Sequence, residues 1–276
     1  MTAAISHRPS VKATVRQTSI ITRRNILRNI RLPRLLVFAT IQPVMFLVLF
    51  NYVFGGAVSD AGPAAAAGSY IDWLIPGILV QSAVFGSSQT AVGLTEDLGA
   101  GVIDRFRSLP IARSAVLAGR TNADLFRGLW VNLLMLAVGY AMGWRFGQGF
   151  PKMMLGLAIV LAFAYTMSWG MACLGLAIKD SEAVQVASFL PLFPLVFASS
   201  VFVPTSTMPS WLQVFADNQP ITILANAARS LMLPEQAVTQ IGLSQGSLIV
   251  QSLAWTAGLM LLFAPLAVRL YRRVSD

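Results

Sequence analysis

Long apolar stretches set the pattern of this chain. Six runs contain no charged residue, and short polar or charged segments separate them. They cover residues 35–59, 73–95, 128–144, 153–178, 183–216 and 236–268. Because a hydrocarbon layer about 30 Å thick needs roughly 20 apolar residues of helix to cross it, the pattern predicts six membrane-spanning helices.

The predicted fold class is an all-α, polytopic integral membrane protein with six transmembrane helices. A basic tail at 1–34 precedes the transmembrane domain at 35–270, and a short tail at 271–276 follows it. The first apolar run starts only at Leu35 and lacks a small-residue cleavage pattern, which favours a retained span over a signal peptide. We place the spans at about 35–55, 71–94, 118–143, 153–178, 183–203 and 247–268.

Composition agrees with this pattern and narrows the function. Hydrophobic residues make up 56% of the 276 residues and charged residues 11%, and the mean hydropathy is +0.68. These values exclude a large water-soluble domain within the chain. The single Cys173 and the single His7 also exclude a disulfide framework or a Cys/His metal cluster built by one chain.

The basic residues predict the orientation. With a cytoplasmic N-terminus, six crossings place 17 Lys and Arg inside and only Arg145, Lys152 and Arg229 outside. This is the asymmetry that the positive-inside rule describes, so we expect both termini in the cytoplasm and the protein in the plasma membrane. The formal charge of +9 then reflects the basic residues on the predicted cytoplasmic side. Nucleic acid is therefore not an expected partner.

The basic tail has a helical pattern of its own. Five apolar or small side chains repeat at helical spacing, and most of the Arg residues lie on the other side. They are Val11, Val15, Thr18, Thr22 and Ile26. The pattern predicts an amphipathic helix on the inner leaflet, with membrane lipids as its partner. Ile20 and Leu27 fall on the basic side, so a solvated basic tail held by anionic lipid stays open.

Enzymatic activity is not expected of this chain. It has no Gly-Lys dipeptide, so the phosphate-binding loop of P-loop ATPases is missing. Its only His lies outside the spans, and no pair of carboxylates lies at bilayer depth. We therefore expect no catalytic residue, no metal site and no cofactor bound by the chain.

The predicted inner segment after the second span mixes charged and apolar residues. Val102, Ile103, Phe106 and Leu109 form a helically spaced stripe. Asp104, Arg105 and Arg107 lie beside that stripe. A short amphipathic helix of this kind suits a partner protein, although a solvated loop is the alternative.

On the predicted outer side, residues 204–232 are too interrupted by proline to span the membrane. Pro204, Pro209 and Pro220 divide an apolar sequence. The pattern predicts a pair of short interfacial or re-entrant helices. Trp211 could equally be a simple aromatic anchor at the membrane surface.

Several polar residues lie inside the predicted spans, where they are costly unless they face a helix, a partner or water. As candidates for a substrate path we take Gln42, Asn51, Gln81, Gln89 and Asn132. Hydrogen bonds between helices are the alternative for each. Asp124 and Arg127, three residues apart at the predicted inner end of the third span, are interpreted as a local ion pair.

Strings along most of the chain resemble the ABC-2-type transporter permeases, and most closely the daunorubicin/doxorubicin-resistance permeases. Each string is short, but their order and the six-span layout agree with that family. No resemblance extends before Thr18. The strings are Phe46–Ser59, Leu74–Gln81, Gly101–Pro110, Phe193–Leu195, Thr207–Leu212, Asn218–Thr222 and Ala228–Met232.

The resemblance implies one half of an exporter. Two permease protomers, expected to be identical, would pair in the membrane, and separate ABC ATPase subunits would bind ATP and Mg²⁺ below them. A cytoplasmic coupling helix would follow the second span, and the N-terminal segment from Thr18 would be a connecting helix beside the ATPase. Short outer helices would cap the exit. The implied ATPase-coupling residues are Glu96, Asp97, Asp104, Arg105, Phe106, Arg107, Leu109, Pro110 and Ile111.

The expected cargo is a hydrophobic drug or lipid-like molecule moved outward by alternating access. A permease for a glycolipid or polysaccharide is the nearest alternative. A proton-driven carrier would need an ionisable residue in mid-bilayer, and the predicted spans contain none at that depth. A membrane-embedded enzyme is the remaining alternative, and it lacks candidate catalytic residues.

Overall fold

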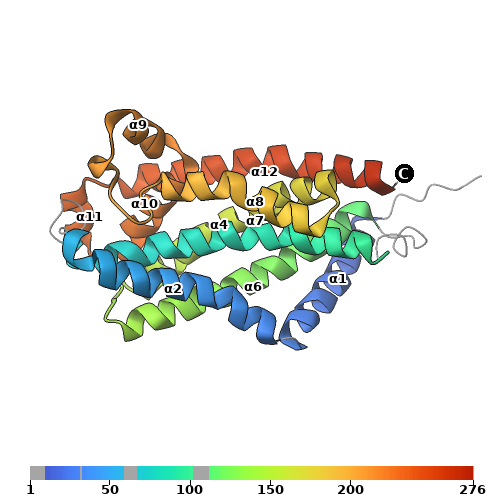
Figure 1. The fold of residues 1–276 in the computed structure, drawn as a ribbon, viewed down its shortest axis with the longest axis horizontal. Helices are drawn as coiled ribbons and strands as arrows, with labels where there is room; N and C mark the ends of the chain where they lie inside the picture. Colours follow the sequence, from blue (N-terminus) through green and yellow to red (C-terminus); the bar gives the residue numbers. More distant parts are fainter. Residues whose placement is uncertain (1–9, 32, 59–66, 102–111, 276) are drawn as a thin grey trace, which may run out of the picture.

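The computed structural model describes residues 10–31, 33–58, 67–101 and 112–275. Within these ranges all regular secondary structure is helical. Six helices run along the length of the molecule at the positions of the six predicted spans (Figure 1). They are α2 (Pro33–Val58), α4 (Tyr70–Gly99), α6 (Arg113–Ala141), α7 (Phe150–Ile178), α8 (Ser181–Phe197) and α12 (Gln245–Ser275).

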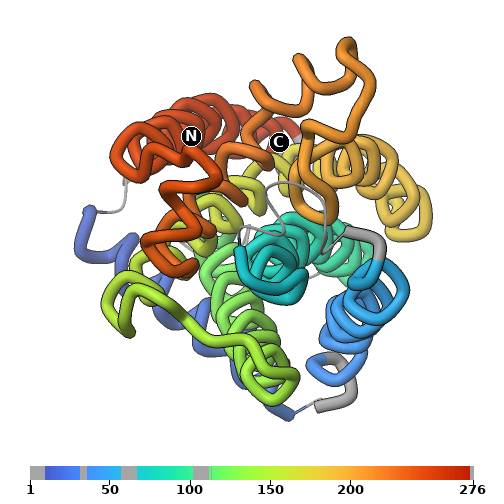
Figure 2. Tube along the Cα trace, turned by 90° about the vertical axis from the view of Figure 1, so that its left-hand side faces the viewer, coloured from blue at the N-terminus to red at the C-terminus, as the bar shows by residue number. Residues whose placement is uncertain are grey.

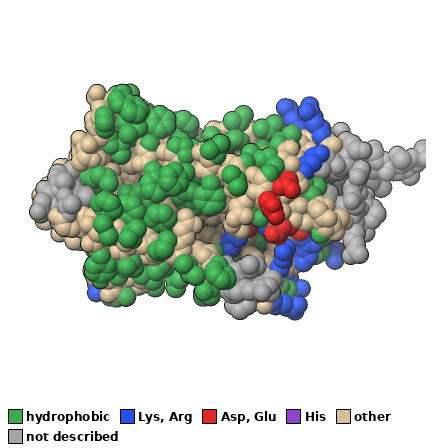
Figure 3. All heavy atoms as spheres, viewed as in Figure 1, with side chains coloured by type: hydrophobic (Ala, Val, Ile, Leu, Met, Phe, Trp, Pro, Cys, Tyr) green, Lys and Arg blue, Asp and Glu red, His purple; other side chains and the backbone are tan. Residues whose placement is uncertain are grey.

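Three of these helices are long and apolar enough to cross a membrane by length and composition. They contain the segments Leu36–Gly56, Phe150–Ile178 and Gln245–Arg273. Helix α8 is apolar but shorter. The large apolar side chains of α2 and α12 are widely exposed, and hydrophobic side chains cover most of the face seen in Figure 3. Such a surface suits lipid or another apolar partner.

Helix α4 lies at the centre of the bundle, with the other long helices around it (Figure 2). It packs most extensively against α7. A Cβ atom at Gly175 would lie 2.8 Å from the carbonyl oxygen of Ala91, so glycine is needed for this close approach. Because protein rather than lipid surrounds α4, the helix can carry polar residues that an exposed span could not.

The fifth predicted span was expected to reach residue 203, but α8 ends at Phe197. Pro191 and Pro194 lie in its last two turns, and the chain then turns back toward the bundle. The backbone groups freed by this turn are paired with side chains. The Gln219 amide donates to the carbonyl of Ala198, and the backbone N–H of Ser200 donates to the Thr222 hydroxyl.

Short helices follow α8 at one end of the molecule (Figure 1). The predicted pair of helices in 204–232 is present as α9 (Ser210–Asn218) and α10 (Pro220–Met232). They are preceded by the 3₁₀ turn η1 (Thr205–Thr207) and followed by α11 (Glu235–Ile241). Almost every residue of α10 is buried, and α10 packs against α4, α7 and α12. Its structural role is therefore that of a core element.

At the opposite end lie α1 (Val11–Arg31) and the C-terminal end of α12 (Figure 1). Lys, Arg and acidic side chains gather at this end (Figure 3). The helix predicted within the basic tail is present, but its buried residues are Ile21 and Asn25, while Val11 and Val15 are exposed. Helix α1 packs closely on α6 at Gly119. A Cβ atom added at Gly119 would lie only 2.6 Å from Cγ2 of Ile21, so the absence of a side chain at this position allows the close contact.

Candidate functional site

A cavity of about 330 Å³ opens between α2, α4 and α6, with α1, α7 and α8 completing its walls. Figure 3 shows the surface hollowed beside the acidic side chains. Phe38, Phe85, Phe189 and Val131 provide apolar wall. The polar wall comes from amides, hydroxyls and charged groups, namely Asn25, Asn29, Gln42, Gln81, Ser82, Ser87, Ser88, Gln89, Ser168, Arg28, Glu96, Arg120, Asp124 and Arg127.

Asp124 on α6 anchors the charged part of this wall. Its side chain is only 5% exposed. The Thr90 hydroxyl of α4 donates to it at 2.7 Å, Arg120 Nε lies 3.4 Å from it, and Arg127 Nη2 lies 3.6 Å from it. A buried carboxylate is tolerated when it is paired and hydrogen-bonded in this way.

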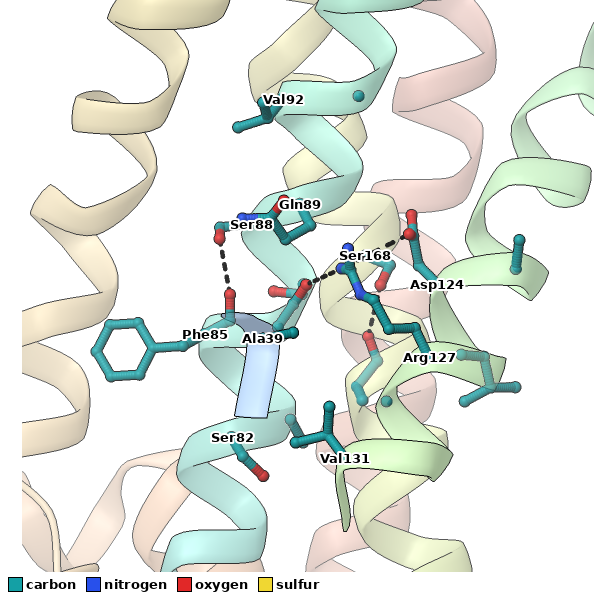
Figure 4. A pocket seen from close by; sticks show the side chains of 18 of the residues that line it. Ala39, Ser82, Phe85, Ser88, Gln89, Val92, Asp124, Arg127, Val131 and Ser168 are labelled. Atoms are coloured by element: carbon teal, nitrogen blue, oxygen red, sulfur yellow. Dashed lines mark hydrogen bonds and ion pairs between the residues drawn. The ribbon is translucent and has the colours of Figure 1, made fainter. Parts of the chain in front are cut away.

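Arg127 reaches from α6 toward the middle of α4 (Figure 4). Its Nη2 donates to the carbonyl of Gly86 at 3.0 Å. Because α6 begins at Arg113 rather than near residue 118, Arg127 lies about 21 Å along the helix from its start. Asp124 and Arg127 are therefore deeper in the bundle than the sequence suggested.

At the mouth of the cavity, ion pairs join three helices. Arg120 on α6 lies 3.5 Å from Asp97 at the end of α4. Arg28 on α1 lies 3.4 Å from Glu96 and 3.9 Å from Asp97. Arg28 and Glu96 are about half exposed, so this pair contributes roughly 0–1 kcal/mol to stability. The main effect of the Arg28–Glu96 pair is to hold α1 against the end of α4.

Two of the predicted ATPase-coupling residues, Glu96 and Asp97, belong to this mouth. The other seven, Asp104, Arg105, Phe106, Arg107, Leu109, Pro110 and Ile111, lie outside the described residues and stay predictions. The described chain resumes at Ala112, whose backbone N–H donates to the Gln17 side chain of α1 at 2.9 Å. Helix α1 thus contacts the chain on both sides of residues 102–111.

Three of the five substrate-path candidates, Gln42, Gln81 and Gln89, line the cavity. Asn132 makes helix contacts instead, since it accepts from the Ser82 hydroxyl at 3.1 Å and donates to the Gly128 carbonyl. Asn51 lies outside the cavity lining. Whether any of them touches a substrate stays a prediction.

With this geometry in place, comparison with known proteins gives the family. The ABC-2 type transporter family matches residues 16–233. The chain belongs to this family. Among its relatives, a daunorubicin resistance ABC transporter permease of Streptomyces coeruleorubidus is 34% identical over 240 residues, which cover 87% of this chain and 80% of the relative.

Two further relatives of this ABC-2 transporter chain are more distant. A probable doxorubicin resistance ABC transporter permease of Mycobacterium tuberculosis is 26% identical over 262 residues, or 95% of this chain and 90% of the relative. An inner membrane transport permease of Escherichia coli is 21% identical over 202 residues, or 72% and 77%. The resemblance noted from the sequence motifs is confirmed.

The cavity of this ABC-2 transporter chain contains charged residues that sequence reasoning did not assign to it. Arg120, Asp124 and Arg127 follow i, i+4 and i+7 spacing and therefore share one face of α6. This alternation of charge was the available signal. The spacing of Asp124 and Arg127 by itself predicts only a local ion pair. The partners from α4 and α1 could not be inferred from spacing alone.

At the other end of this ABC-2 transporter chain, Arg229 of α10 is completely buried. It donates to the Trp73 carbonyl, to the side chains of Ser200 and Asn226, and to the carbonyls of Ser200 and Val201 at distances between 2.6 and 3.1 Å. Its guanidinium also stacks 3.6 Å from the ring centre of Trp73. The sequence indicates no more than an outer basic residue at Arg229, whereas in the structure this side chain joins the turn after α8 to α4 and α10.

Proposed function

We propose that this chain is the membrane-spanning permease subunit of an ATP-driven exporter for hydrophobic drugs or lipid-like molecules. The observation that carries the proposal is the 34% identity to a daunorubicin resistance permease across 87% of the chain. In this proposal all six long helices cross the plasma membrane, both termini are cytoplasmic, and α9, α10 and α11 lie at the outer end.

Energy would come from a separate ABC ATPase that binds ATP and Mg²⁺, and residues 96–111 would receive its movement. The contacts of α1 support this coupling role. Arg28 pairs with Glu96 and Asp97 before the segment, and Gln17 binds the backbone of Ala112 after it. Asp97 pairs in turn with Arg120, which reaches Asp124 in the cavity. A displacement at the inner end would therefore have a path of packed charged groups to the cavity.

A second, identical permease subunit would complete the transport path. The exposed apolar side chains of α2 and α12 form a surface large enough to contact both lipid and a partner protomer. A permease for a glycolipid or polysaccharide is the second candidate. The volume of the cavity, about 330 Å³, is that of a small-molecule site and favours the drug-like cargo.

The test is purification of the full chain from its native host in mild detergent, followed by mass spectrometry and an ATPase assay. We expect a chain with Walker motifs to copurify and to hydrolyse ATP. Reversing charge with Arg105→Glu and Arg107→Glu should remove that chain from the preparation.

Arg269→Glu with Arg273→Glu is the matched control, because it makes the same charge change in the exposed end of α12. This control should retain the ATPase. Recovery of the intact permease without any ATPase would contradict the proposed function. Loss of the ATPase in both double variants would contradict the coupling role of the 102–111 segment.

A further inference from the structure

Helix α1 carries a strongly basic surface at the end of the molecule where Lys and Arg side chains gather (Figure 3). The helix contains six Lys and Arg residues, and no acidic residue precedes Asp60 in the chain. Three of these bases, Arg24, Arg28 and Arg31, follow i, i+4 and i+7 spacing and therefore lie on one face of the helix. Together with Leu27 they line an open groove, the α1 groove. All four side chains are exposed.

The protein neutralises the positive charge of the α1 groove incompletely. Arg28 lies 3.4 Å from a carboxylate oxygen of Glu96 and 3.9 Å from one of Asp97. Both contacts are long, and the side chains of Arg28 and Glu96 are about half exposed, so water weakens the attraction. Arg31 has no ion pair within the described part of the chain. An anion in the groove would therefore meet uncompensated positive charge at Arg31.

The position of the α1 groove favours a lipid headgroup as this anion. Arg31 is five residues before Leu36, where the apolar segment of α2 begins. Beyond that point Val37 and Phe38 are 57% and 69% exposed, as side chains in contact with lipid would be. The headgroup layer on each side of the hydrocarbon core is about 5–8 Å thick, so long Arg side chains at this position can reach it. Leu27, exposed among the three arginines, offers apolar contact to the same lipid.

We propose that the α1 groove binds the phosphate of an anionic phospholipid, and that this phosphate competes with Glu96 for Arg28. All three bases of the groove are arginines, whose planar guanidinium binds phosphate oxygens through two parallel hydrogen bonds. Arg28 also lines the cavity and holds α1 against the end of α4. Lipid charge thereby regulates the contact between α1 and the proposed ATPase-coupling end of α4. The inference rests on the proposed function only for this regulatory consequence.

Lipid binding to the purified full chain tests the site. Native mass spectrometry in mild detergent, with either phosphatidylglycerol or phosphatidylcholine of the same acyl chains added, gives a dissociation constant for each lipid. Phosphatidylglycerol is anionic, whereas phosphatidylcholine is zwitterionic. We expect the first phosphatidylglycerol to bind at least about tenfold tighter than phosphatidylcholine. Inorganic phosphate at low millimolar concentration should displace no more lipid than sodium chloride of equal ionic strength, because the acyl chains add apolar contacts that a free anion lacks.

Arg24→Gln with Arg31→Gln is the decisive variant, because it removes charge from the groove and leaves Arg28 with its partners. It should abolish most of the preference for phosphatidylglycerol. Arg16→Gln with Arg23→Gln is the matched control, since it removes the same charge from exposed positions of α1 outside the groove. This control should keep the preference. Both variants replace exposed side chains, so neither should disturb folding.

A second pair of variants tests the competition for Arg28. Glu96→Gln removes the nearest carboxylate of the protein, so phosphatidylglycerol should bind several-fold tighter. Glu235→Gln, at an exposed position of α11, makes the same charge change far from the groove and should leave lipid binding unchanged. Equal lipid binding in the two variants would overturn the competition.

Equal loss of the lipid preference in the two double variants would overturn the proposal, because it would show a general attraction of lipid to a basic helix. Displacement of lipid by inorganic phosphate would overturn it as well and assign the groove to a free anion. An unchanged preference in the groove variant, together with loss of the copurifying ATPase, would assign the groove to the ATPase. The exporter function stands through a failed lipid test as long as the wild-type chain retains its ATPase. A wild-type chain with the lipid preference but without any ATPase would instead remove the exporter function and leave the lipid site.

Discussion

The structural role of a single residue, Arg229, could not be predicted from its residue type. As a basic residue in a predicted outer segment, Arg229 was expected to be exposed, yet it is fully buried. Its guanidinium donates hydrogen bonds to Trp73, Ser200, Val201 and Asn226. Its partners lie up to 156 positions away in the chain. No local pattern could have predicted them, because the contacts exist only once α4, α8 and α10 have packed.

Replacing Arg229 should therefore destabilise the fold strongly. Arg229→Met leaves several buried carbonyl oxygens without donors, and we expect the free energy of unfolding to fall by about 3 kcal/mol or more. The measurement is thermal unfolding of the full chain in detergent, followed by intrinsic fluorescence. Arg269→Met, at an exposed position, is the control and should change little. An Arg229→Met protein as stable as the control would contradict the anchoring role.

Elements were easier to predict than contacts. The long helices follow from apolar runs of the right length, and the two short helices from the prolines that divide 204–232. Helix α8 ends six residues before the predicted span bound at 203, because Pro191 and Pro194 precede a turn stabilised by distant side chains. A helix in the basic tail was predicted, but its buried face was not. Ile21 contacts α6 at Gly119 and Asn25 lines the cavity, which the spacing of the tail alone could not indicate.

The contact between α1 and α6 allows a test at this scale. Gly119→Val would drive a side chain into Ile21, whose Cγ2 already lies 2.6 Å from the position of a Cβ atom. We expect α1 to separate from α6 and hydrogen exchange over residues 10–31 to increase several-fold. Gly258→Val, at a position in α12 with no atom within 4 Å of an added Cβ, is the matched control. Equal exchange in the two variants would show that α1 is not held at Gly119.

For the whole molecule, the sequence predicted a helical membrane protein and its family but not its cavity. A cavity depends on side chains that fail to fill the space between helices, and hydropathy patterns do not contain that information. Gln42, Gln81 and Gln89 were selected because polar groups are costly in lipid, and they do share one cavity. Asn132 met the same criterion but pairs with Ser82, so polarity within a span does not separate a binding role from a packing role.

The orientation of the whole molecule gives the last prediction. The charge asymmetry predicts that the end with α1 lies in the cytoplasm and the end with α11 outside. In a Cys173→Ser background, Gln240→Cys in α11 should react with a membrane-impermeant maleimide added to intact cells, and Val11→Cys should react only after the membrane is opened. Both positions are exposed in the folded chain, so burial cannot mimic protection. Labelling of Val11→Cys alone in intact cells would invert the topology, and it would place the predicted ATPase-coupling segment on a side of the membrane where no ATP is supplied.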